Sequence, residues 1–455
     1  MSVKLGKCAF RFIAAIVLLS SAVTEVTQAG ETTGEALATE EIRTLRDLPN
    51  LANPTNVIRS DAQIKRLVQQ ALDNSPAIRE ARYSSDAAQQ DITAAKGQRL
   101  PQVSISSGAT TYTGEIATAG SASRPYYGVN ASVPVYDFGR ITAQVKGREA
   151  NYEASRARYA QQANQLAIET VTTCLQYTKQ RALLFVADEY LLTVQKLADM
   201  LAQVTEADPG RRGELVQVRS RMLQAKQARE NARSTGREFK IRLDRLLGKE
   251  NAALCAGIDA RFFDMPDIEI LKAKVRENPQ VKAFNFDYEA ALRQLDQINA
   301  TRKPQVQATA AHSPIAAGLS NNYYQTFTLS MSVPIYDGKI LESNEKAALE
   351  RARASGERVD QTVRQLESDY LERYEEATGA LRRVDEYIKL IEINDKVRKD
   401  FFVQWYALGR RSLFELLAME FEQYTLQQGY FTSLFDGMIG VATIMGNAGQ
   451  LTAME

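Results

Sequence analysis

Residues 132–139 read Ser-Val-Pro-Val-Tyr-Asp-Phe-Gly, and residues 332–338 read Ser-Val-Pro-Ile-Tyr-Asp-Gly. The two copies lie about 200 residues apart, a period far longer than that of a solenoid repeat. Two other landmarks recur in the same order and at nearly the same spacing, Pro-Gln-Val at 101–103 and 304–306 and Gly-Arg-Arg at 210–212 and 409–411. The chain is therefore an internal duplication, in which each copy forms one half of a single fold.

The residues that precede each copy of the motif alternate between apolar and polar side chains, the period of a β-strand with two different faces. The apolar members are Val129, Ala131 and Val133 in the first half and Phe327, Leu329, Met331 and Val333 in the second. A further alternating run precedes each of these strands. We therefore predict two β-hairpins, over 102–136 and 305–336.

After each copy of the motif the sequence becomes strongly charged and lacks proline for about 70 residues, enough for about 105 Å of helix at 1.5 Å per residue. We expect these long helices over 139–208 and 338–408, with apolar residues spaced by about 3.6 positions. Each ends at a glycine-containing turn. Return helices are then expected over 212–248 and 412–446.

The N-terminus carries Lys4, Lys7 and Arg11 near an apolar run over 12–19, the pattern of a secretory signal peptide. Cleavage is expected after Ala22 or Ala29, with Ala29 preferred. A capping box of Ser60 and Gln63 marks the expected start of the first helix, which should be interrupted at Asn74-Ser75-Pro76. The predicted segments are a signal peptide (1–29), an extended arm (30–58), a first repeat (59–248), a connection (249–265), a second repeat (266–448) and a tail (449–455).

Composition excludes several classes of function. The 455-residue chain has 56 Lys and Arg against 55 Asp and Glu, so no bulk charge attracts nucleic acid. His312 is the only histidine, and no cluster of catalytic or metal-ligating residues surrounds it. We therefore expect no enzyme activity, no cofactor and no metal. Cys174 and Cys255 remain after export and could pair, but we favour small buried apolar residues over a disulfide.

Each hairpin has one apolar and one polar face, which an ordinary half-exposed sheet would also show. The strand from Tyr127 to Tyr136 is long enough to cross the apolar band of an outer-membrane barrel when it is tilted. Aromatic residues lie where a membrane girdle belongs, at Tyr126, Tyr127, Tyr323 and Tyr324. Four strands cannot close a barrel, so a membrane barrel would be shared between copies, with eight strands in a dimer or twelve in a trimer.

The long helices also need neighbours, because an amphipathic helix of this length has no core of its own. Two antiparallel pairs per chain, repeated around an axis, would form a cylinder that continues the barrel. Such helices can alternatively form a solid coiled-coil rod.

The combination of these motifs resembles the TolC family of bacterial outer-membrane efflux and secretion channels. The resemblance covers about residues 60–448 and rests on the stretches 74–78, 100–140, 277–281, 303–338 and 406–424. It implies a mainly α fold with a small membrane β-barrel, closed as a trimer with a twelve-stranded barrel and a twelve-helix tunnel. It also implies a place in the outer membrane, extending into the periplasm, and docking to an inner-membrane transporter through a periplasmic adaptor protein.

The resemblance also implies roles for residues at the two glycine turns. Tyr406 and Arg411 match positions whose bonds hold the periplasmic mouth closed. Glu415 matches an acidic ring at the pore constriction, whereas the family's second acidic position falls on Ala418. The adaptor would dock at the helix tips, which contain Gly210, Arg211, Arg212, Gly409 and Arg410. On the strands, Val129, Ala131, Val133, Phe327, Leu329, Met331 and Val333 would face lipid.

These expectations describe a passive trimeric export channel in contact with outer-membrane lipid, and the Asp208–Arg212 turn and the single acidic ring favour type I protein secretion over drug efflux. The alternative is a periplasmic coiled-coil adaptor or a structural protein of an export complex. An adaptor should show one central helical hairpin flanked by β-rich domains and an inner-membrane anchor, and this sequence shows neither.

Overall fold

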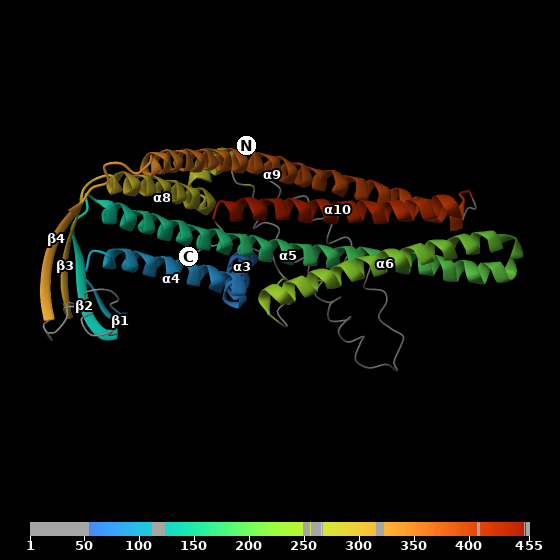
Figure 1. Cartoon of the computed structure of the whole chain (residues 1–455). Helices are drawn as coiled ribbons and strands as arrows, with labels where there is room; N and C mark the ends of the chain where they lie inside the picture. The colour runs from blue at the N-terminus through green and yellow to red at the C-terminus, as the bar shows by residue number, and fades with distance from the viewer. Residues whose placement is uncertain are drawn as a thin grey trace. The chain divides into compact units, whose positions relative to one another are not determined.

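A computed structural model describes residues 54–111, 123–248, 255, 265, 267–314, 323–406, 410–449 and 451 (Figure 1). The predicted fold class is confirmed, because long helices accompany one small antiparallel sheet. The elements are α3 (Pro54–Asn74), α4 (Pro76–Gly97), β1 (Gln102–Thr111), β2 (Ser123–Tyr136), α5 (Arg140–Ala207), η2 (Pro209–Arg211), α6 (Arg212–Leu247), α7 (Ile268–Lys274), η5 (Val275–Glu277), α8 (Pro279–Thr301), β3 (Gln305–Pro314), β4 (Tyr323–Ser332), α9 (Ile340–Tyr406) and α10 (Leu413–Asn447).

The chain divides into two compact units. The sheet unit consists of 77–162 and 275–366 and contains all four strands. The turn unit consists of the described residues up to Pro76, those of 163–274 and those from Glu367 onward, and it contains both glycine-bearing turns. Helices α5 and α9 contribute residues to both units. Among the described residues, no helix has the length and apolar character needed to cross a membrane.

The duplicated motif converts a strand into a long helix. The carboxylate of Asp137 accepts hydrogen bonds from the backbone N–H groups of Gly139 (3.1 Å) and Ile141 (2.6 Å), at the start of α5. In the second copy, Asp337 accepts from the N–H of Leu341 (2.7 Å) at the start of α9. Each carboxylate thus satisfies N–H groups that the first turn of a helix leaves without partners. Gly139 and Gly338 have φ values of +88° and +66°, which explains the glycine at the end of both copies.

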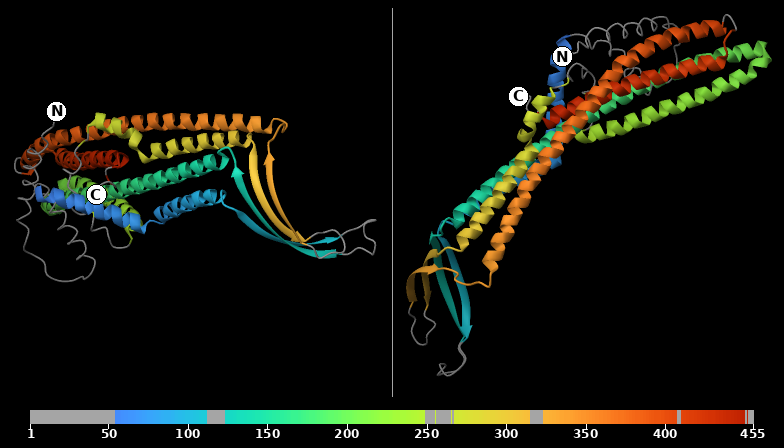
Figure 2. Two further views of the ribbon diagram at one scale, coloured as in Figure 1. Left: turned by 90° about the vertical axis from the view of Figure 1, so that its left-hand side faces the viewer. Right: turned by 90° about the horizontal axis from the view of Figure 1, so that it is seen from above.

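The four strands form one antiparallel sheet in the order β1-β2-β3-β4 (Figure 2). Strands β2 and β3 pair across the two halves of the duplication, with Val133 opposite Ala308. Strand β4 ends at Ser332, earlier than the expected end at 336. Its pairing ends there because Ser332 lies opposite Gln305, the first residue of β3. Val333, predicted as a strand residue, therefore lies just beyond the sheet.

In the sheet unit the helices form a single layer in the order α4-α5-α8-α9. Lys96 of α4 pairs with Glu149 of α5 (3.4 Å), and Arg158 of α5 pairs with Asp287 of α8 (2.5 Å). The guanidinium of Arg358 on α9 lies 4.6 Å from the ring centroid of Phe284 on α8. The inner helices α5 and α8 thus each contact a neighbour on two sides, and the outer helices α4 and α9 each contact one.

In the turn unit the four longest helices follow the order α6-α5-α10-α9, and α3 packs against α5 and α6. Arg229 of α6 pairs with Asp188 of α5 (2.6 Å), and the ring of Tyr190 on α5 stacks on Tyr424 of α10 (4.7 Å between centroids). Helix α10 packs closely on its neighbours through glycines. A Cβ atom at Gly446 would lie 2.2 Å from Cγ1 of Ile168, and one at Gly440 would lie 2.7 Å from Cβ of Ala377. These contacts exclude any larger residue at both positions unless the helices shift.

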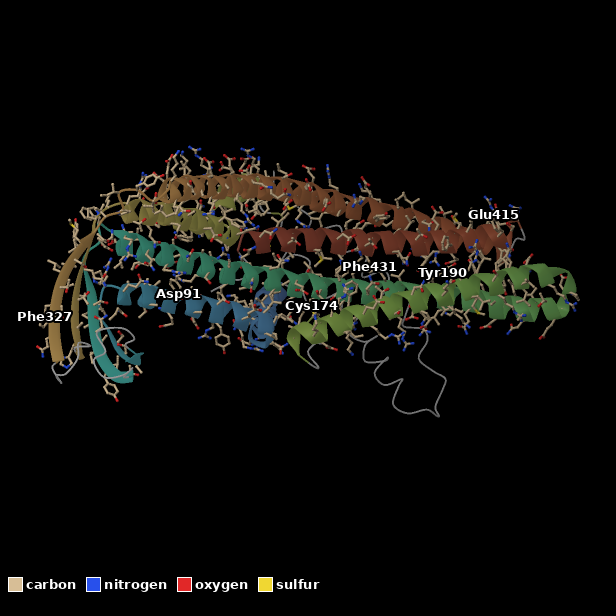
Figure 3. The ribbon with its side chains drawn as sticks, in the orientation of Figure 1. Asp91, Cys174, Tyr190, Phe327, Glu415 and Phe431 are labelled. Atoms are coloured by element: carbon tan, nitrogen blue, oxygen red, sulfur yellow. A yellow bond between two sulfur atoms is a disulfide. The ribbon has the colours of Figure 1, made fainter. Side chains whose placement is uncertain are left out.

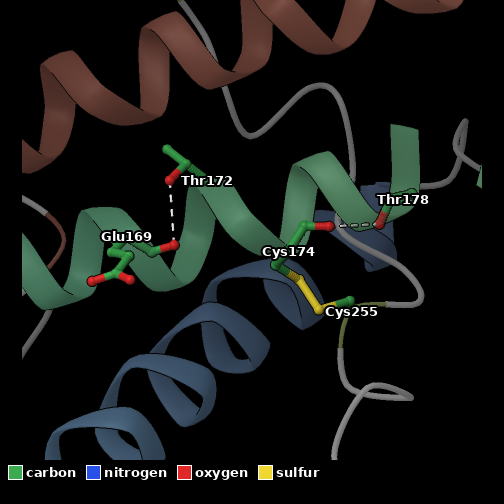
Figure 4. Close-up of a disulfide and its surroundings, with 5 residues drawn as sticks. All are labelled: Glu169, Thr172, Cys174, Thr178 and Cys255. Carbon is green, nitrogen blue, oxygen red and sulfur yellow. Dashed lines mark hydrogen bonds between the residues drawn. A yellow bond between two sulfur atoms is a disulfide. The ribbon is translucent and has the colours of Figure 1, made fainter. Parts of the chain in front are cut away.

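Cys174 and Cys255 are joined by a disulfide, which corrects the expectation that they are unpaired (Figure 4). The bond links α5 to the connection that follows α6. Both cysteines are buried, at 0% and 1% exposure, in a cluster with Leu67, Leu243 and Leu247. The sequence pattern showed Cys174 inside a helix but could not show which chain segment covers it.

The segment boundaries differ from expectation at the N-terminal end. Helix α3 begins at Pro54, whereas the capping box at Ser60 predicted a later start and an extended arm up to 58. Proline suits the first position of a helix, because its φ is already helical and its missing N–H needs no partner there. The break between α3 and α4 lies at Ser75, before Pro76. The predicted signal peptide (1–29) and most of the predicted connection (249–265) lie outside the described residues.

Candidate functional site

The register of the sheet places the predicted apolar residues on one face. Val103 lies opposite Ala131, Ala131 opposite Ala310, and Ala310 opposite Phe327. Residues directly opposite each other in an antiparallel pair project to the same face. The same alignment connects Ile105 with Val129 and Leu329 with Ala308. The apolar face of the sheet therefore continues across all four strands.

The opposite face of the sheet is polar. Ser104 lies opposite Asn130, Ser132 opposite Thr309, and Thr309 opposite Thr328. Ser330 lies opposite Gln307 and donates its hydroxyl to the carbonyl oxygen of Gln307 (3.4 Å). The folded sheet thus has the predicted apolar face on one side and the predicted polar face on the other.

The apolar face is uncovered in the single chain. Phe327, Ile105 and Leu329 are 80%, 79% and 71% exposed, and Figure 3 shows Phe327 on β4. Large apolar surfaces of this kind mark contact with a partner or a membrane. Within the described sheet, the outer strands β1 and β4 each pair on one side only. An unpaired edge beside an uncovered apolar face is a surface on which another chain can pair.

Aromatic residues lie at the helix end of the sheet, where sequence reasoning did not place a girdle. A register shift between Pro134 and Tyr136 pairs Tyr136 with Val306, whose other partner is Met331 on the apolar face. Tyr136 packs edge-on against Phe138 (4.6 Å between centroids). Tyr336, from the second copy of the motif, is also exposed. The tyrosine that both copies of the duplicated motif contain was the sequence feature that could have predicted these aromatic residues.

Of the predicted girdle, the structure describes the side chain of Tyr127, which is exposed and lies opposite Ser107 on the apolar face. The side chains of Tyr126, Tyr323 and Tyr324 lie outside the described part of the chain. His312 occupies the apolar face, opposite Val129 and Gln325.

The first turn joins α5 to α6. The Asp208 carboxylate accepts a hydrogen bond from the N–H of Gly210 (3.0 Å) and caps η2. Arg211 forms an ion pair with Glu214 (2.7 Å), one turn further along α6. Arg212, the first residue of α6, is exposed. A carboxylate and a proline therefore fix the backbone, and Arg212 remains exposed.

The second turn joins α9 to α10. Ser412 and Glu415 form a capping box in which Glu415 Oε2 accepts from the Ser412 N–H (2.9 Å). Glu415 Oε1 accepts from Arg411 Nη1 (2.9 Å). The Ser412 N–H, followed by the Arg411 guanidinium, holds the pKa of Glu415 below its usual range. Glu415 lies at the start of α10 (Figure 3), and its charge is shared between the cap and Arg411.

Arg411 also holds the end of α9. Its Nε donates to the side-chain oxygen of Gln404 (3.2 Å), and its guanidinium lies 4.5 Å from the ring centroid of Phe401. Tyr406 is exposed and stacks on Phe402 (5.9 Å between centroids). Arg410 is exposed, and Gly409 lies outside the described residues. The roles predicted for Tyr406 and Arg411 in closing bonds remain predictions.

The structure brings the two turns together through an arginine and a tryptophan. The guanidinium of Arg211 lies 5.7 Å from the ring centroid of Trp405, within the range of a cation–π interaction. Trp405 is buried in a cluster with Leu413 and Leu416 of α10 and Leu201 of α5. The first turn is thus in contact with the end of α9 inside one chain.

A buried ion pair on α9 and α10 was missed by sequence reasoning. Arg398 contacts both carboxylate oxygens of Glu420 (3.2 and 3.1 Å) and also pairs with Asp395 (2.8 Å). The Glu420 side chain is 8% exposed. Burial raises the pKa of Glu420, and the charge of Arg398 opposes that effect. Glu420 stands in the apolar run that begins at Leu413, which was the available signal.

The described residues contain no group of three or more His, Cys, Asp or Glu side chains placed to hold a metal ion. What the chain offers instead is a surface: an apolar sheet face, two unpaired sheet edges and two adjacent turns that contain arginine.

Residues 67–249 and 271–387 match the family model described as outer membrane efflux protein. No curated protein matches the chain. Several solved structures share its fold, among them VceC, MtrE and CmeC. VceC, an outer membrane protein of Vibrio cholerae, is 16% identical with a TM-score of 0.74, over 85% of this chain and 96% of its own. The open state of the MtrE outer membrane channel of Neisseria gonorrhoeae is 15% identical with a TM-score of 0.75, over 86% and 89%. The CmeC outer membrane channel of Campylobacter jejuni is 12% identical with a TM-score of 0.75, over 85% and 86%.

Proposed function

The chain belongs to the outer membrane efflux protein family, and we propose that three copies of it form a passive channel through the bacterial outer membrane. Energy for export would come from an inner-membrane transporter, connected through a periplasmic adaptor protein. Because the chain belongs to this family, a channel is favoured over the alternative of a periplasmic adaptor or a structural protein.

The observation that carries this proposal is the sheet with one apolar face and one polar face. One face is apolar across all four strands and bears the exposed side chains of Ile105, Phe327 and Leu329. The other face is polar, and both outer strands have an unpaired edge. In lipid every backbone polar group needs a partner, so the edges must be closed by other copies. Three copies give a barrel of twelve strands, wide enough for a lumen lined by the polar face. Two copies would give eight strands, whose interior side chains would fill.

The helices support the same arrangement. Within each unit the long helices follow one order, in which each inner helix contacts a neighbour on either side. Such a row of helices can be repeated around an axis to form a wall, with one surface facing a tunnel. The tips at Gly210, Arg211, Arg212, Gly409 and Arg410 are then the proposed docking site for the adaptor. Tyr406 and Arg411 are proposed to close the mouth and Glu415 to line its constriction.

For the cargo we propose protein secretion first. Ala418 replaces a second acidic position, and Glu415 shares its charge with Arg411. The mouth would therefore place few fixed charges in the path of a passing polypeptide. Efflux of small molecules is the second candidate, favoured by the description of the family.

The channel proposal is tested on the purified protein. Light scattering corrected for detergent should give the mass of a trimer, and planar bilayers should show discrete conductance steps. A monomer that stays soluble without detergent would contradict the proposal. The proposal for the cargo is tested in the native host by deleting the gene that encodes this chain. Loss of an exported protein with unchanged drug susceptibility supports secretion, and the reverse supports efflux.

A further inference from the structure

In the turn unit, α6 and α9 stand at the two ends of the order α6-α5-α10-α9, and each carries exposed apolar residues away from its buried side. On α6, Val218 and Ala225 are buried against α5, whereas Val216 and Leu223 are 66% and 64% exposed. These two exposed residues are seven positions apart, two helical turns, and so lie on one side of α6.

Helix α9 shows the same division. Val384 and Ile391 are buried, and Ile391 lies two positions before Ile393, which is 61% exposed. Val397 follows Ile393 by four positions and is exposed as well, so the two form a second apolar strip. Both strips lie opposite the buried sides of their helices, so one chain does not bring them together. A second copy can.

The contact between Arg211 and Trp405 fixes the level of one helix relative to the other. Leu223 lies 12 residues after Arg211, about 18 Å along α6 at 1.5 Å per residue. Ile393 lies 12 residues before Trp405, again about 18 Å along α9 in the antiparallel direction. A rotation about an axis along the helices leaves these levels unchanged. In a ring of copies, Leu223 of one chain therefore stands level with Ile393 of the next.

Charged residues beside the two apolar strips also lie at similar heights along α6 and α9. Arg219 lies about 12 Å from the level of Arg211, and Asp400 lies about 8 Å from the level of Trp405. Both side chains are exposed in the single chain. The difference of about 4 Å is within the reach of an arginine side chain. Opposite charges therefore flank the apolar strips at matching heights.

We propose that α6 of one copy packs lengthwise against α9 of the next copy, with Leu223 against Ile393 and Arg219 beside Asp400. The partner is a second copy of this chain, and the proposal rests on the ring of copies in the proposed function. It adds to that function a contact surface with a defined register, built from residues that are exposed in the single chain.

The register is tested with Leu223→Cys and Ile393→Cys in one chain. The native cysteines of the mature protein are bonded to each other and buried, so the new thiols are the reactive ones. Mild oxidation in detergent should convert most of the protein into covalent dimers and trimers. The matched control combines Leu223→Cys with Leu371→Cys. Leu371 is also exposed on α9 but stands about 33 Å further from Trp405 than Ile393 does. The control should give at least tenfold less cross-linked product.

Light scattering on the same samples separates the two proposals. A trimer without the Leu223–Ile393 cross-link, or with equal cross-linking in the control, overturns the register and leaves the channel proposal standing. A monomer overturns both. A second test does not depend on cysteines: Arg219→Glu and Asp400→Arg should each lower the fraction that survives heating as a trimer, and the double exchange should restore it. Failure of the double exchange to restore the trimer also overturns the proposed contact.

Discussion

Arg411 and Glu415 form an ion pair of 2.9 Å (Nη1 to Oε1) across one helical turn at the start of α10. The same carboxylate completes the capping box with Ser412. Glu415 therefore contributes to the local structure of the turn as well as to any electrostatic effect on a passing ion. Arg411, in turn, connects the start of α10 with Gln404 and Phe401 on α9.

Substitution of Glu415 and substitution of Arg411, made separately, should change the ion selectivity of the channel in opposite directions. Glu415→Gln removes the carboxylate that compensates the charge of Arg411 in each copy, so the preference for cations should fall. Arg411→Ser leaves an unpaired carboxylate and releases Gln404, so the cation preference and the resting conductance should both rise. The measurement is the reversal potential in planar bilayers under a salt gradient. Unchanged selectivity in both variants would show that the constriction lies elsewhere.

Acidic pH should reproduce the Glu415→Gln phenotype. The pKa of Glu415 is lowered in the folded chain, so its contribution to stability is fully present above the pKa of a free glutamate. That contribution is lost as the pH falls through the lowered folded pKa. Selectivity of the parent should therefore change below the pH at which a free glutamate titrates. The Glu415→Gln channel, measured in parallel, should lack this step, and a step of equal size in both would assign it to another group.

The two faces of β4 should respond differently to a charge. Arginine at Leu329 would project into lipid and should destabilise the barrel by about 2–4 kcal/mol near the midplane. Arginine at Ser330, the next residue, should leave the trimer intact and alter conductance. Heat stability of the trimer on gels and single-channel recording report the two effects. Equal effects at both positions would contradict the alternation seen in the register.

The buried ion pair of α9 and α10 gives a sharp stability prediction. Arg398→Met leaves Glu420 buried without its partner and should cost about 3–5 kcal/mol. Lys399→Met removes an exposed partner of Asp395 and should cost at most about 1 kcal/mol. Unfolding in detergent compares the two variants. Because burial raises the pKa of Glu420, protonation should relieve the defect, so the cost of Arg398→Met should shrink as the pH falls.

The disulfide predicts the thiol content of the exported protein. Alkylation after denaturation without reductant should label no cysteine of the mature chain, and reduction should release two. Cys255→Ser should lower the free energy of unfolding by about 2–4 kcal/mol, the range usual for a long closed loop. Two reactive thiols in the unreduced protein would contradict the bond between Cys174 and Cys255.

The strands and long helices could be predicted because each element has a period in its own sequence. Phe327, Leu329 and Met331 alternate strictly, and the motif that ends at Gly139 and Gly338 marks where each long helix starts. The register across β2 and β3 follows from neither pattern, since Val133 and Ala308 are far apart in the sequence. The apolar faces nevertheless had to coincide, because a shift by one residue would turn one strand over.

The candidate site was less predictable, because its contacts depend on which helices are neighbours. Arg211 gives no sign in the sequence of its position over Trp405, nor does Arg398 of its pairing with Glu420. To predict the Cys174–Cys255 bond, one would have to know where the connection lies in the fold, and the sequence of that connection has no periodic pattern. The start of α3 was misplaced because a capping box at Ser60 competed with a proline at Pro54, and the sequence could not rank the two signals.

Trp405 gives the protein an internal optical probe. It is the only tryptophan in the chain, and it is buried next to the guanidinium of Arg211. Its emission therefore comes from one place, where the turn between α5 and α6 meets the end of α9. Separation of the turns would let water reach the indole and shift its emission to longer wavelength. Movement at the turns can thus be followed in the unlabelled protein, with Arg211→Ala as the reference for an indole that has lost its cation.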